Sequence, residues 1–368
     1  MPTVVLISQM PLPYSGIGSW TTLYNNYLRN NHKIDSIVCS KPEELFEGIL
    51  YSFVKVTFVS KLKNRLLKRK KTEYLKALDK LINPQKKYII QVVDNYGMIK
   101  PLQNYLLSKG IRNNCYIQFF YHGYPPYVQK TATLDFYENI DEIILLTKDS
   151  YILHKKEIKL MPDFFSILPN GINTDSFKKI ADLEKNKLKE QFNVEDKTVF
   201  LWCSNDRPKK GLELILEVWK NLYVQFENIV LLVVGAEREK EIKGVRFLGK
   251  IPNESLPEYY QLSDCYLFPT LCQEGFGLSL IEALHCGCHC IASALGGVPE
   301  VLQYGKLGRL IENPHLVVEW EEAIIDFLKG KFEISNVPEN LYSQEQWNVE
   351  MNTIIENAKF RLKNNSAK

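Results

Sequence analysis

The stretch Glu274-Gly-Phe-Gly-Leu-Ser-Leu-Ile-Glu282 carries two carboxylates eight residues apart, one just before an expected helix over 276–286 and one on it. At about 3.6 residues per turn the two acids lie on one side of the helix, about 12 Å apart along its axis. Between them, Gly275 and Gly277 leave backbone N–H groups free to meet a phosphate at the helix N-terminus. A sugar, a phosphate and a ribose in line fit this pattern, which suits a nucleotide sugar. The alternative is an ordinary helix start with acidic residues.

Apolar runs of strand length alternate with helix-like periodic stretches from one end of the chain to the other. This pattern is typical of parallel sheets covered by helices, so we expect an α/β protein with two doubly wound domains. A turn-rich passage at 169–173 precedes a charged stretch at 178–191, and we place the domain boundary after residue 175. The expected strands are 4–8, 34–39, 88–93, 115–121 and 142–147 in domain 1–175, and 198–203, 229–234, 245–247, 265–268 and 289–293 in domain 176–343.

A basic loop, Ser204-Asn-Asp-Arg-Pro-Lys-Lys-Gly211, follows the first strand of the second domain. Ligands of doubly wound domains bind beyond the carboxyl ends of the strands, so this loop and Glu274 are expected at the same edge of the sheet. A departing phosphate needs positive charge there, and Lys210 is the first candidate and Arg207 the second. The alternative is a solvated basic turn.

The first domain has two candidate features at strand ends. Tyr14-Ser-Gly-Ile-Gly-Ser-Trp20 follows the first strand and opens a helix, but it lacks the third glycine of a dinucleotide-binding loop. No acid ends the second strand either, which argues against NAD binding. His122 ends the fourth strand, on the side where ligands bind. The alternatives are a tight turn without a ligand for Gly16 and Gly18, and a structural histidine.

These motifs resemble the retaining glycosyltransferases of GT-B fold, family 4 (glycosyl transferases group 1), which are marked by a Glu, seven residues and a second Glu. The resemblance implies two Rossmann-like domains that face a cleft, and a terminal helix, here about 344–362, that returns to the first domain. It also implies that Glu274 contacts the donor sugar, that Glu282 takes the ribose hydroxyls, and that His122 lies beside the reacting carbon.

The resemblance extends to further donor-binding positions, with one departure. Asn205 stands where family members commonly have an arginine, so either Arg207 reaches in or Lys210 acts alone, because an amide cannot replace a guanidinium. Gly296-Gly297 matches a further family signature, for which a structural turn is the alternative. The other positions implied are the backbone of Phe276, Gly277 and Leu278, the Ser279 hydroxyl, the nucleobase loop at Ile251, and the turn with Gly16 and Gly18.

Length and composition argue against several other classes. The 368 residues suit two domains, and the 45% hydrophobic and 24% charged content is average for globular proteins. A net charge of +3 gives no reason to expect nucleic acid as a partner. No apolar run reaches the length of a bilayer span, and the N-terminus has no signal-peptide pattern, so we expect a cytoplasmic protein. The eight cysteines, Cys286, Cys288 and Cys290 among them, are expected to be buried small side chains, and no metal or cofactor is expected.

The stretch from Lys61 to Lys71 packs seven cations into eleven residues, with leucines along one edge. A basic amphipathic helix can lie on an anionic membrane surface, which would suit an acceptor carried on a lipid. The alternative is a solvated helix that covers the first sheet.

The sequence therefore predicts a metal-independent, retaining glycosyltransferase that moves a sugar from a UDP- or GDP-sugar to a glycan or lipid-linked acceptor. Surface polysaccharide or lipopolysaccharide synthesis is the expected setting, with the protein in the cytoplasm or peripheral on the inner face of the membrane. Two alternatives remain: a non-catalytic nucleotide-sugar-binding partner of the same fold, and a dinucleotide-dependent oxidoreductase.

Overall fold

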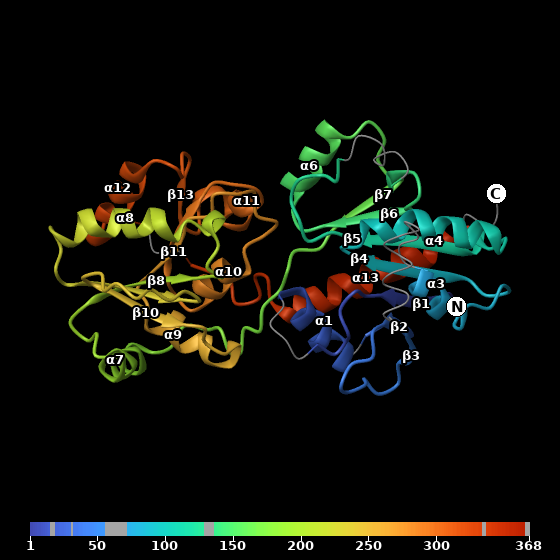
Figure 1. Cartoon of the computed structure of the whole chain (residues 1–368), viewed down its shortest axis with the longest axis horizontal. Coiled ribbons are helices and arrows are strands. Elements are labelled where there is room, and N and C mark those ends of the chain that lie inside the picture. Colours follow the sequence, from blue (N-terminus) through green and yellow to red (C-terminus); the bar gives the residue numbers. More distant parts are fainter. Residues whose placement is uncertain (15–18, 31, 56–71, 129–135, 333–335, 365–368) are drawn as a thin grey trace. The chain divides into compact units, whose positions relative to one another are not determined.

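A computed structural model describes residues 1–14, 19–30, 32–55, 72–128, 136–332 and 336–364. The chain forms two compact units: Met1–Asn170 together with Gln344–Lys368, and Gly171–Ser343 (Figure 1). The division falls inside the turn-rich passage 169–173, a few residues before the boundary at 175 suggested by the sequence. Each unit contains one parallel sheet with helices, so the predicted α/β class with two doubly wound sheets is confirmed.

The first unit has a seven-stranded parallel sheet in the order β3-β2-β1-β4-β5-β6-β7, and the prediction of five strands was wrong. The two strands that the sequence did not reveal, β3 (Leu50–Phe53) and β7 (Phe164–Ile167), are the edge strands of the sheet. Each has four residues and only partial burial, so neither forms the continuous apolar run of a central strand. The other strands are β1 (Thr3–Ile7), β2 (Ser36–Cys39), β4 (Tyr88–Val93), β5 (Cys115–Phe120) and β6 (Glu142–Leu145).

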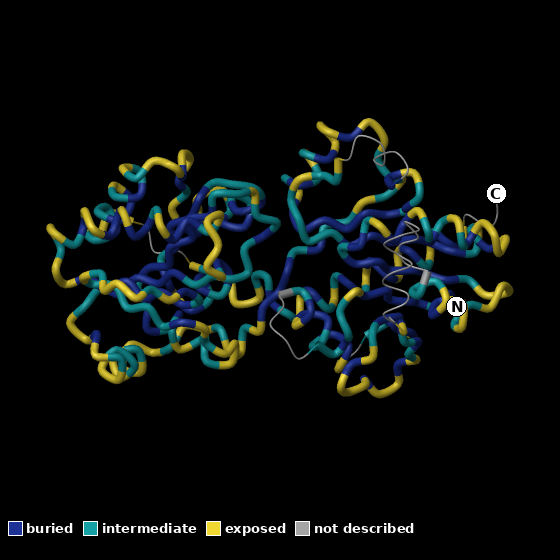
Figure 2. The backbone as a smooth tube through the Cα atoms, viewed as in Figure 1, coloured by how far each residue is buried: buried dark blue, intermediate teal, exposed yellow. Residues whose placement is uncertain are grey.

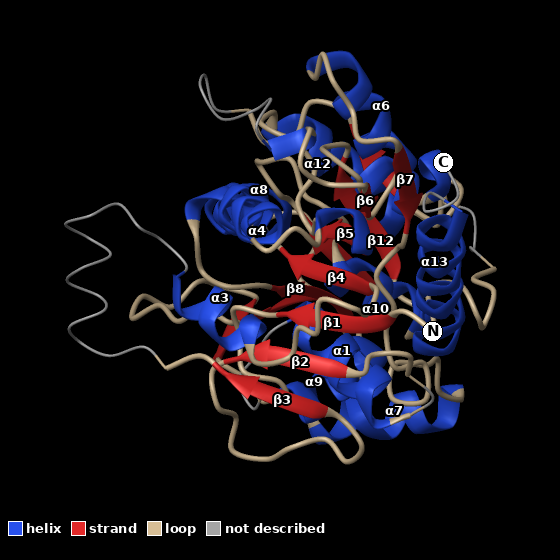
Figure 3. Cartoon of the chain, turned by 90° about the vertical axis from the view of Figure 1, so that its right-hand side faces the viewer, coloured by secondary structure: helices blue, strands red, loops and turns tan. Residues whose placement is uncertain are grey.

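Helices cover both faces of this sheet (Figure 3). Helices α1 (Ser19–Arg29) and α13 (Gln344–Asn364) pack on one face, where alternate residues of β1 such as Val4 and Leu6 point. Helices α3 (Thr72–Asp79) and α4 (Tyr96–Ser108) pack on the other face, against Val5 and Ile7. The remaining described helix of the unit, α6 (Lys148–Glu157), follows β6.

The C-terminal helix α13 belongs to the first unit although it follows the whole of the second unit in sequence. Its buried face includes Trp347, Met351 and Ile355, which recur every fourth residue. Near its end, Arg361 forms an ion pair of 2.9 Å with Glu142 of β6, whose side chain is fully buried. Apolar packing and the ion pair of Arg361 with the buried Glu142 therefore hold this helix on the first sheet.

The second unit has a six-stranded parallel sheet in the order β10-β9-β8-β11-β12-β13. Only the three-residue edge strand β13 (Arg309–Ile311) was not predicted. The other strands are β8 (Thr198–Cys203), β9 (Ile229–Val234), β10 (Val245–Gly249), β11 (Cys265–Phe268) and β12 (His289–Ser293). The helices are α7 (Asp182–Gln191), α8 (Leu212–Tyr223), α9 (Leu256–Leu262), α10 (Leu278–His285), α11 (Val298–Val301) and α12 (Val317–Leu328).

Both sheets reverse their strand order at one point. In the first sheet β1 lies between β2 and β4, and in the second β8 lies between β9 and β11. The helical connections on either side of such a point lead to opposite faces, which opens a crevice at the carboxyl ends of the two central strands. The strands β1, β4, β8 and β11 are buried except at the first residue of β1 and the two end residues of β8 (Figure 2), so a ligand site is expected in the loops that follow them.

Candidate functional site

Two loops meet at the reversal point of the second sheet, and glycine is what lets them meet. The loop after β8 contains Lys210, and the loop after β11 begins at Pro269. Leu271 N donates to Lys209 O at 2.8 Å, which joins the two loops directly. Gly211 has a φ of +69°, and a Cβ placed there would lie 1.9 Å from the carbonyl oxygen of Pro269. Packing therefore requires a glycine at position 211, directly after Lys210.

Lys210 and Glu274, which are far apart in sequence, form an ion pair at this point. Lys210 Nζ lies 2.5 Å from Glu274 Oε1, and both side chains are less than one fifth exposed. The same Oε1 accepts from Thr270 Oγ1 at 2.9 Å and from Cys272 Sγ at 3.6 Å. None of the hydrogen bonds formed by the described residues reaches Oε2. One carboxylate oxygen is thus occupied by the protein and the other is open.

The pKa of Glu274 is lower than that of an ordinary glutamate. Burial raises the pKa, but the charge of Lys210 and the hydrogen bonds from Lys210, Thr270 and Cys272 lower it by more. Glu274 is therefore a carboxylate at neutral pH, and it accepts hydrogen bonds but cannot donate them.

The backbone of Glu274 is held by the Gly296-Gly297 turn after β12. Gly297 N donates to Glu274 O at 2.9 Å, and Glu274 and Gly296 form an isolated parallel bridge. Gly296 has a φ of +69°, and a Cβ there would lie 2.3 Å from Glu274 O. This turn therefore has a structural role: it allows the close backbone approach that positions Glu274.

The helix after Glu274 begins later than the sequence suggested. Helix α10 runs from Leu278, because Gly277 adopts a φ of +92° and forms its N-cap, and Phe276 is buried in the preceding loop. Glu274 precedes the helix and Glu282 lies on it, as the sequence predicted, and their separation of about 12 Å along the axis stays a prediction. The first-turn N–H groups at Leu278 and Ser279 nevertheless lie beside the Glu274 loop and suit an anion.

Glu282 differs from Glu274 in its ionisation. Burial raises the pKa of Glu282 to about 7, against a smaller lowering by the Tyr260 hydroxyl of α9. Burial also raises the pKa of Cys203, at the end of β8, and the charge of Glu282 contributes to that rise. The second acid therefore lies between α9, α10 and the end of β8. Ser279 lies beside the hydroxyl of Tyr266 in the same region.

Of the two cations predicted to act in place of an arginine at Asn205, Lys210 is partly buried and Arg207 is exposed. Asn205 and Arg207 are both exposed, and Arg207 forms no ion pair with any residue in the described ranges. Asp206, between them, pairs at 2.6 Å with Arg238 of the loop after β9, and Arg238 also pairs at 2.6 Å with Glu213 of α8. Sequence reasoning missed Arg238. Its signal was its place, just past the end of the strand at 229–234.

The loops after β8, β9 and β10 also meet. Gly235 N donates to Gly249 O at 2.6 Å, and a Cβ on Gly235 would lie 2.0 Å from Ser204 O. Ile251, predicted to lie near the nucleobase, is half-buried in the loop that leaves β10 at this same edge. Ile251, Lys210 and Glu274 thus all follow the carboxyl ends of strands in one sheet.

In the first unit His122 follows β5, and its partner is Asp94, which sequence reasoning missed. Asp94 Oδ1 accepts from the backbone N–H of His122 at 2.9 Å, and Asp94 Oδ2 lies 3.0 Å from His122 Nδ1. Trp20 stacks on the His122 ring, with centroids 5.9 Å apart. Burial raises the pKa of Asp94, but His122 lowers it by more, so the pKa is below its ordinary value. A carboxylate on Nδ1 leaves Nε2 to face a ligand. The signal for Asp94 was an acid directly after the strand at 88–93.

Two predictions fall outside the described part of the chain. Gly16 and Gly18 lie in the range 15–18, and the whole basic stretch from Lys61 to Lys71 lies in the range 56–71. The cysteines Cys286, Cys288 and Cys290 are buried and unpaired. Within the described ranges, no three His, Cys, Asp or Glu side chains are grouped as metal ligands. None of the described helices is both long enough and apolar enough to span a bilayer.

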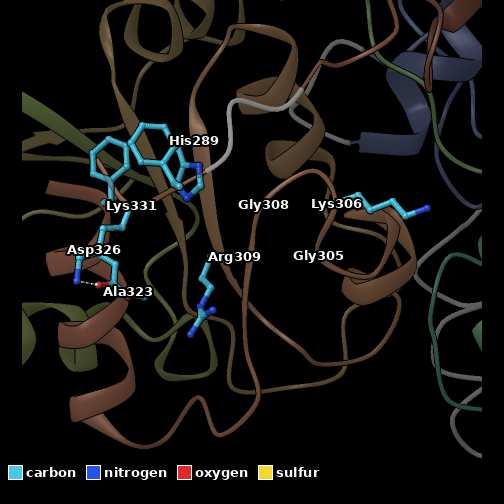
Figure 4. Close-up of a pocket in the computed structure, with 10 residues that line it drawn as sticks. His289, Gly305, Lys306, Gly308, Arg309, Ala323, Asp326 and Lys331 are labelled. Atoms are coloured by element: carbon cyan, nitrogen blue, oxygen red, sulfur yellow. Dashed lines mark ion pairs between the residues drawn. The ribbon is translucent and has the colours of Figure 1, made fainter. Parts of the chain in front are cut away.

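A pocket of about 200 Å³ lies on the other side of the second sheet from the candidate site, where the strands begin (Figure 4). It is lined by His289 and Arg309, which begin β12 and β13, and by Lys306 and Lys331. The side chains of Lys306 and Arg309 point away from the ring of His289. Because the pocket lies at the amino ends of the strands, it shares no residue with the candidate site.

Comparison with known proteins shows that the candidate site of the second unit lies in a region that matches a known family. Residues 184–345 match the model of the family "Glycosyl transferases group 1", which covers most of the second unit and less than half of the chain. Phosphatidyl-myo-inositol mannosyltransferase of Mycobacterium tuberculosis is 29% identical over 152 residues, 39% of this chain and 39% of that protein. The GPI3 subunit of phosphatidylinositol N-acetylglucosaminyltransferase of Saccharomyces cerevisiae is 28% identical over 178 residues, 45% of this chain and 38% of that protein. The chain thus matches about two fifths of the length of these relatives.

Solved structures match nearly the whole chain. Sucrose-phosphate synthase from Thermosynechococcus elongatus superimposes with a TM-score of 0.71 at 18% identity, over 97% of this chain and 99% of that one. Anabaena HepE in complex with UDP-glucose gives a TM-score of 0.72 at 13% identity, over 96% of this chain and 99% of that one. With its two parallel-sheet Rossmann-like units, the chain therefore has the GT-B fold.

Proposed function

We propose that this protein is a glycosyltransferase that moves a sugar from a nucleotide-sugar donor to a glycan or lipid-linked acceptor. The observation that carries the proposal is the pairing of Lys210 with Glu274 at the reversal point of the second sheet. We propose that the helix N-terminus at Leu278 and the partly buried Glu282 complete the site, with one place each for a diphosphate, a sugar and a ribose. The match to a glycosyltransferase family over residues 184–345 covers all of these residues.

In the proposed complex, the second unit binds the nucleotide-sugar donor. Lys210 and the first-turn N–H groups of α10 take the diphosphate, which leaves Oε2 of Glu274 to accept from hydroxyls of the sugar. Glu282 in its ionised form accepts from the ribose hydroxyls. HepE was solved with UDP-glucose and has the same fold, which supports a ligand of this class.

In the proposed reaction the bond between the sugar C1 and the β-phosphate oxygen breaks, and its electron pair stays with the phosphate. A bond forms from C1 to the acceptor oxygen, and the proton of the acceptor hydroxyl leaves to the departing phosphate or to solvent. Charge develops on the leaving diphosphate, so Lys210 stabilises the transition state more than the ground state. We propose that the reaction retains the configuration at C1 and needs no metal, as family 4 resemblance implies.

The first unit is proposed to contribute the acceptor side. His122, held by Asp94 and covered by Trp20, presents Nε2 at the end of β5. The curated relatives are named for transfer to phosphatidylinositol lipids, which supports a lipid-linked acceptor. Attachment to an anionic membrane through the stretch from Lys61 to Lys71, and a role in surface glycan synthesis, belong to the same proposal.

Turnover of nucleotide sugars tests the proposal. The wild-type protein is incubated with UDP-, GDP- and ADP-sugars and an acceptor panel, and release of nucleoside diphosphate is measured together with the glycosylated product. We expect one donor to be consumed, Lys210→Ala to lower kcat by about 100-fold or more with a smaller change in KM, and Glu282→Ala mainly to weaken nucleotide binding. Unchanged kinetics in both variants would contradict the site.

One observation favours a second candidate, a non-catalytic nucleotide-sugar-binding partner. Asn205 replaces the usual arginine, Arg207 is exposed, and Arg238 is neutralised by two acids. Among the described cations of these loops, Lys210 alone is then both partly buried and paired with Glu274. Nucleotide binding without turnover by any donor would support this candidate over the enzyme.

A further inference from the structure

The carboxylate of Glu274 has one oxygen satisfied by the protein and one left for a ligand. Lys210, Thr270 and Cys272 all contact Oε1, and no described residue donates to Oε2. The side chain is 18% exposed, and Oε2 is not among the fully buried oxygens without a partner, so it is accessible to a ligand. A carboxylate oxygen that no protein group contacts can accept from the hydroxyl groups of a ligand.

Glu274 also determines how strongly Lys210 attracts an anion. The two charges are 2.5 Å apart, so a phosphate that approaches Lys210 also approaches a carboxylate. Because both side chains are less than one fifth exposed, repulsion from that carboxylate is screened less than it would be between two exposed groups. The ion pair as a whole therefore offers a phosphate less attraction than an isolated lysine would.

The donor and the product of the proposed reaction differ in two properties that affect their interaction with Glu274: the presence of sugar hydroxyls and the charge of the terminal phosphate. The intact donor brings sugar hydroxyls to Oε2, and its diphosphate is esterified at both ends. The nucleoside diphosphate left after transfer has no sugar to donate to Oε2, and its terminal phosphate carries additional negative charge. Glu274 thus meets a hydrogen-bond donor before transfer and an added repulsive charge after it.

We infer that Glu274 makes the site discriminate against free nucleoside diphosphate and in favour of the intact donor, so that transfer itself weakens the hold on the product. This inference rests on the proposed function, because it assigns the Lys210 and Glu274 site to a diphosphate and a sugar. Selectivity arises from a repulsive group as well as from attractive contacts.

The experiment compares dissociation constants measured by calorimetry. UDP, GDP and ADP and their glucose conjugates are titrated into the wild-type protein and into Glu274→Gln, which keeps the shape of the side chain and removes the charge. For the base that binds, the diphosphate should bind about tenfold tighter to the variant, while the glucose conjugate binds no tighter. The ratio of the two constants therefore shifts by about tenfold.

Two matched variants separate charge from packing. Thr270→Val removes a hydrogen bond to Oε1 but leaves the charges of Lys210 and Glu274 in place, so the ratio should stay within about twofold of wild type. Glu274→Asp keeps a carboxylate and should also keep the discrimination. Glu274→Ala, which removes the charge in a smaller side chain, replaces Glu274→Gln if thermal melting shows that the latter does not fold.

The outcomes distinguish the inference from the proposed function. Diphosphate affinity that is unchanged or weaker in the charge-removing variants overturns the inference, while turnover by the wild-type protein would leave the proposed function intact. A folded wild-type protein that binds none of these nucleotides overturns both.

Discussion

At the scale of single residues, the candidate site depends on two glutamates whose pKa values are shifted in opposite directions. Lys210 holds Glu274 ionised, since it lowers the pKa of that acid below the ordinary range despite burial. Burial raises the pKa of Glu282 to about 7, so at neutral pH it is divided between its two forms. Titratable groups whose environments move their pKa values apart are typical of functional sites.

The ionisation of Glu282 predicts how donor binding depends on pH. Only the carboxylate can accept from both ribose hydroxyls, so affinity should rise as the pH increases through about 7. Between pH 6 and 8 the ionised fraction rises from about one tenth to about nine tenths, and the apparent Kd should fall by roughly ninefold. The sign for stability is the reverse: a folded pKa above the unfolded value favours folding at low pH, and this contribution is lost as the pH rises through 7.

A nucleotide sugar is the right ligand for this measurement, because its esterified diphosphate does not titrate in the range. Calorimetry of the wild-type protein at pH 6, 7 and 8 should show the increase, and Glu282→Gln should show a flat profile with weaker binding. An equally steep profile in Glu282→Gln would assign the pH dependence to another group.

Some residues of the site could be predicted from the sequence and others could not. Lys210, Glu274 and Glu282 stood out by motif and by position after strands. Asp94 and Arg238 did not, because their importance comes from partners distant in sequence, His122 for the first and Asp206 and Glu213 for the second. A pairing of this kind becomes visible only when the loops are brought together in space.

At the scale of elements, central strands were predictable and edge strands were not. The runs at 88–93, 198–203, 229–234, 265–268 and 289–293 match β4, β8, β9, β11 and β12 residue for residue, since these strands are buried on both faces. The strands β3, β7 and β13 are short, partly exposed edges without such a run. The start of α10 was misplaced because the positive φ of Gly277, which ends the preceding loop, is a property of the backbone.

The C-terminal helix gives a prediction at this scale. Arg361 of α13 is the ionic partner of Glu142, which is fully buried and also accepts from Gln118 and Ser166. Arg361→Ala leaves that carboxylate without a counter-charge, so the free energy of unfolding should fall by about 3 kcal/mol. Urea denaturation of the whole chain measures the change.

A control ion pair involves Glu356 of the same helix. Glu356 pairs with Lys33 at 2.8 Å, and both side chains are well exposed. Lys33→Ala should therefore cost less than about 1 kcal/mol. Equal losses of unfolding free energy in Arg361→Ala and Lys33→Ala would show that the buried ion pair stabilises the packing of α13 no more than the exposed one.

At the scale of the whole molecule, two similar parallel sheets have different tasks in the proposed enzyme. Each has one reversal point, and the described candidate residues follow strands that flank or neighbour it: Asp94 and His122 in the first unit, Lys210 and Glu274 in the second. The family match covers only the second unit, while the structural matches cover nearly all of the chain. The fold is therefore established for the whole chain, and the donor site is the better supported half of the function.

The most direct test of the central claim is an experimental structure of the protein with its tightest-binding nucleotide sugar. The account predicts the diphosphate on Lys210 and the N-terminus of α10, sugar hydroxyls on Oε2 of Glu274, and the ribose on Glu282. A nucleotide bound elsewhere, such as in the pocket beside His289 and Arg309, with Lys210 and Glu274 still paired and untouched, would contradict it.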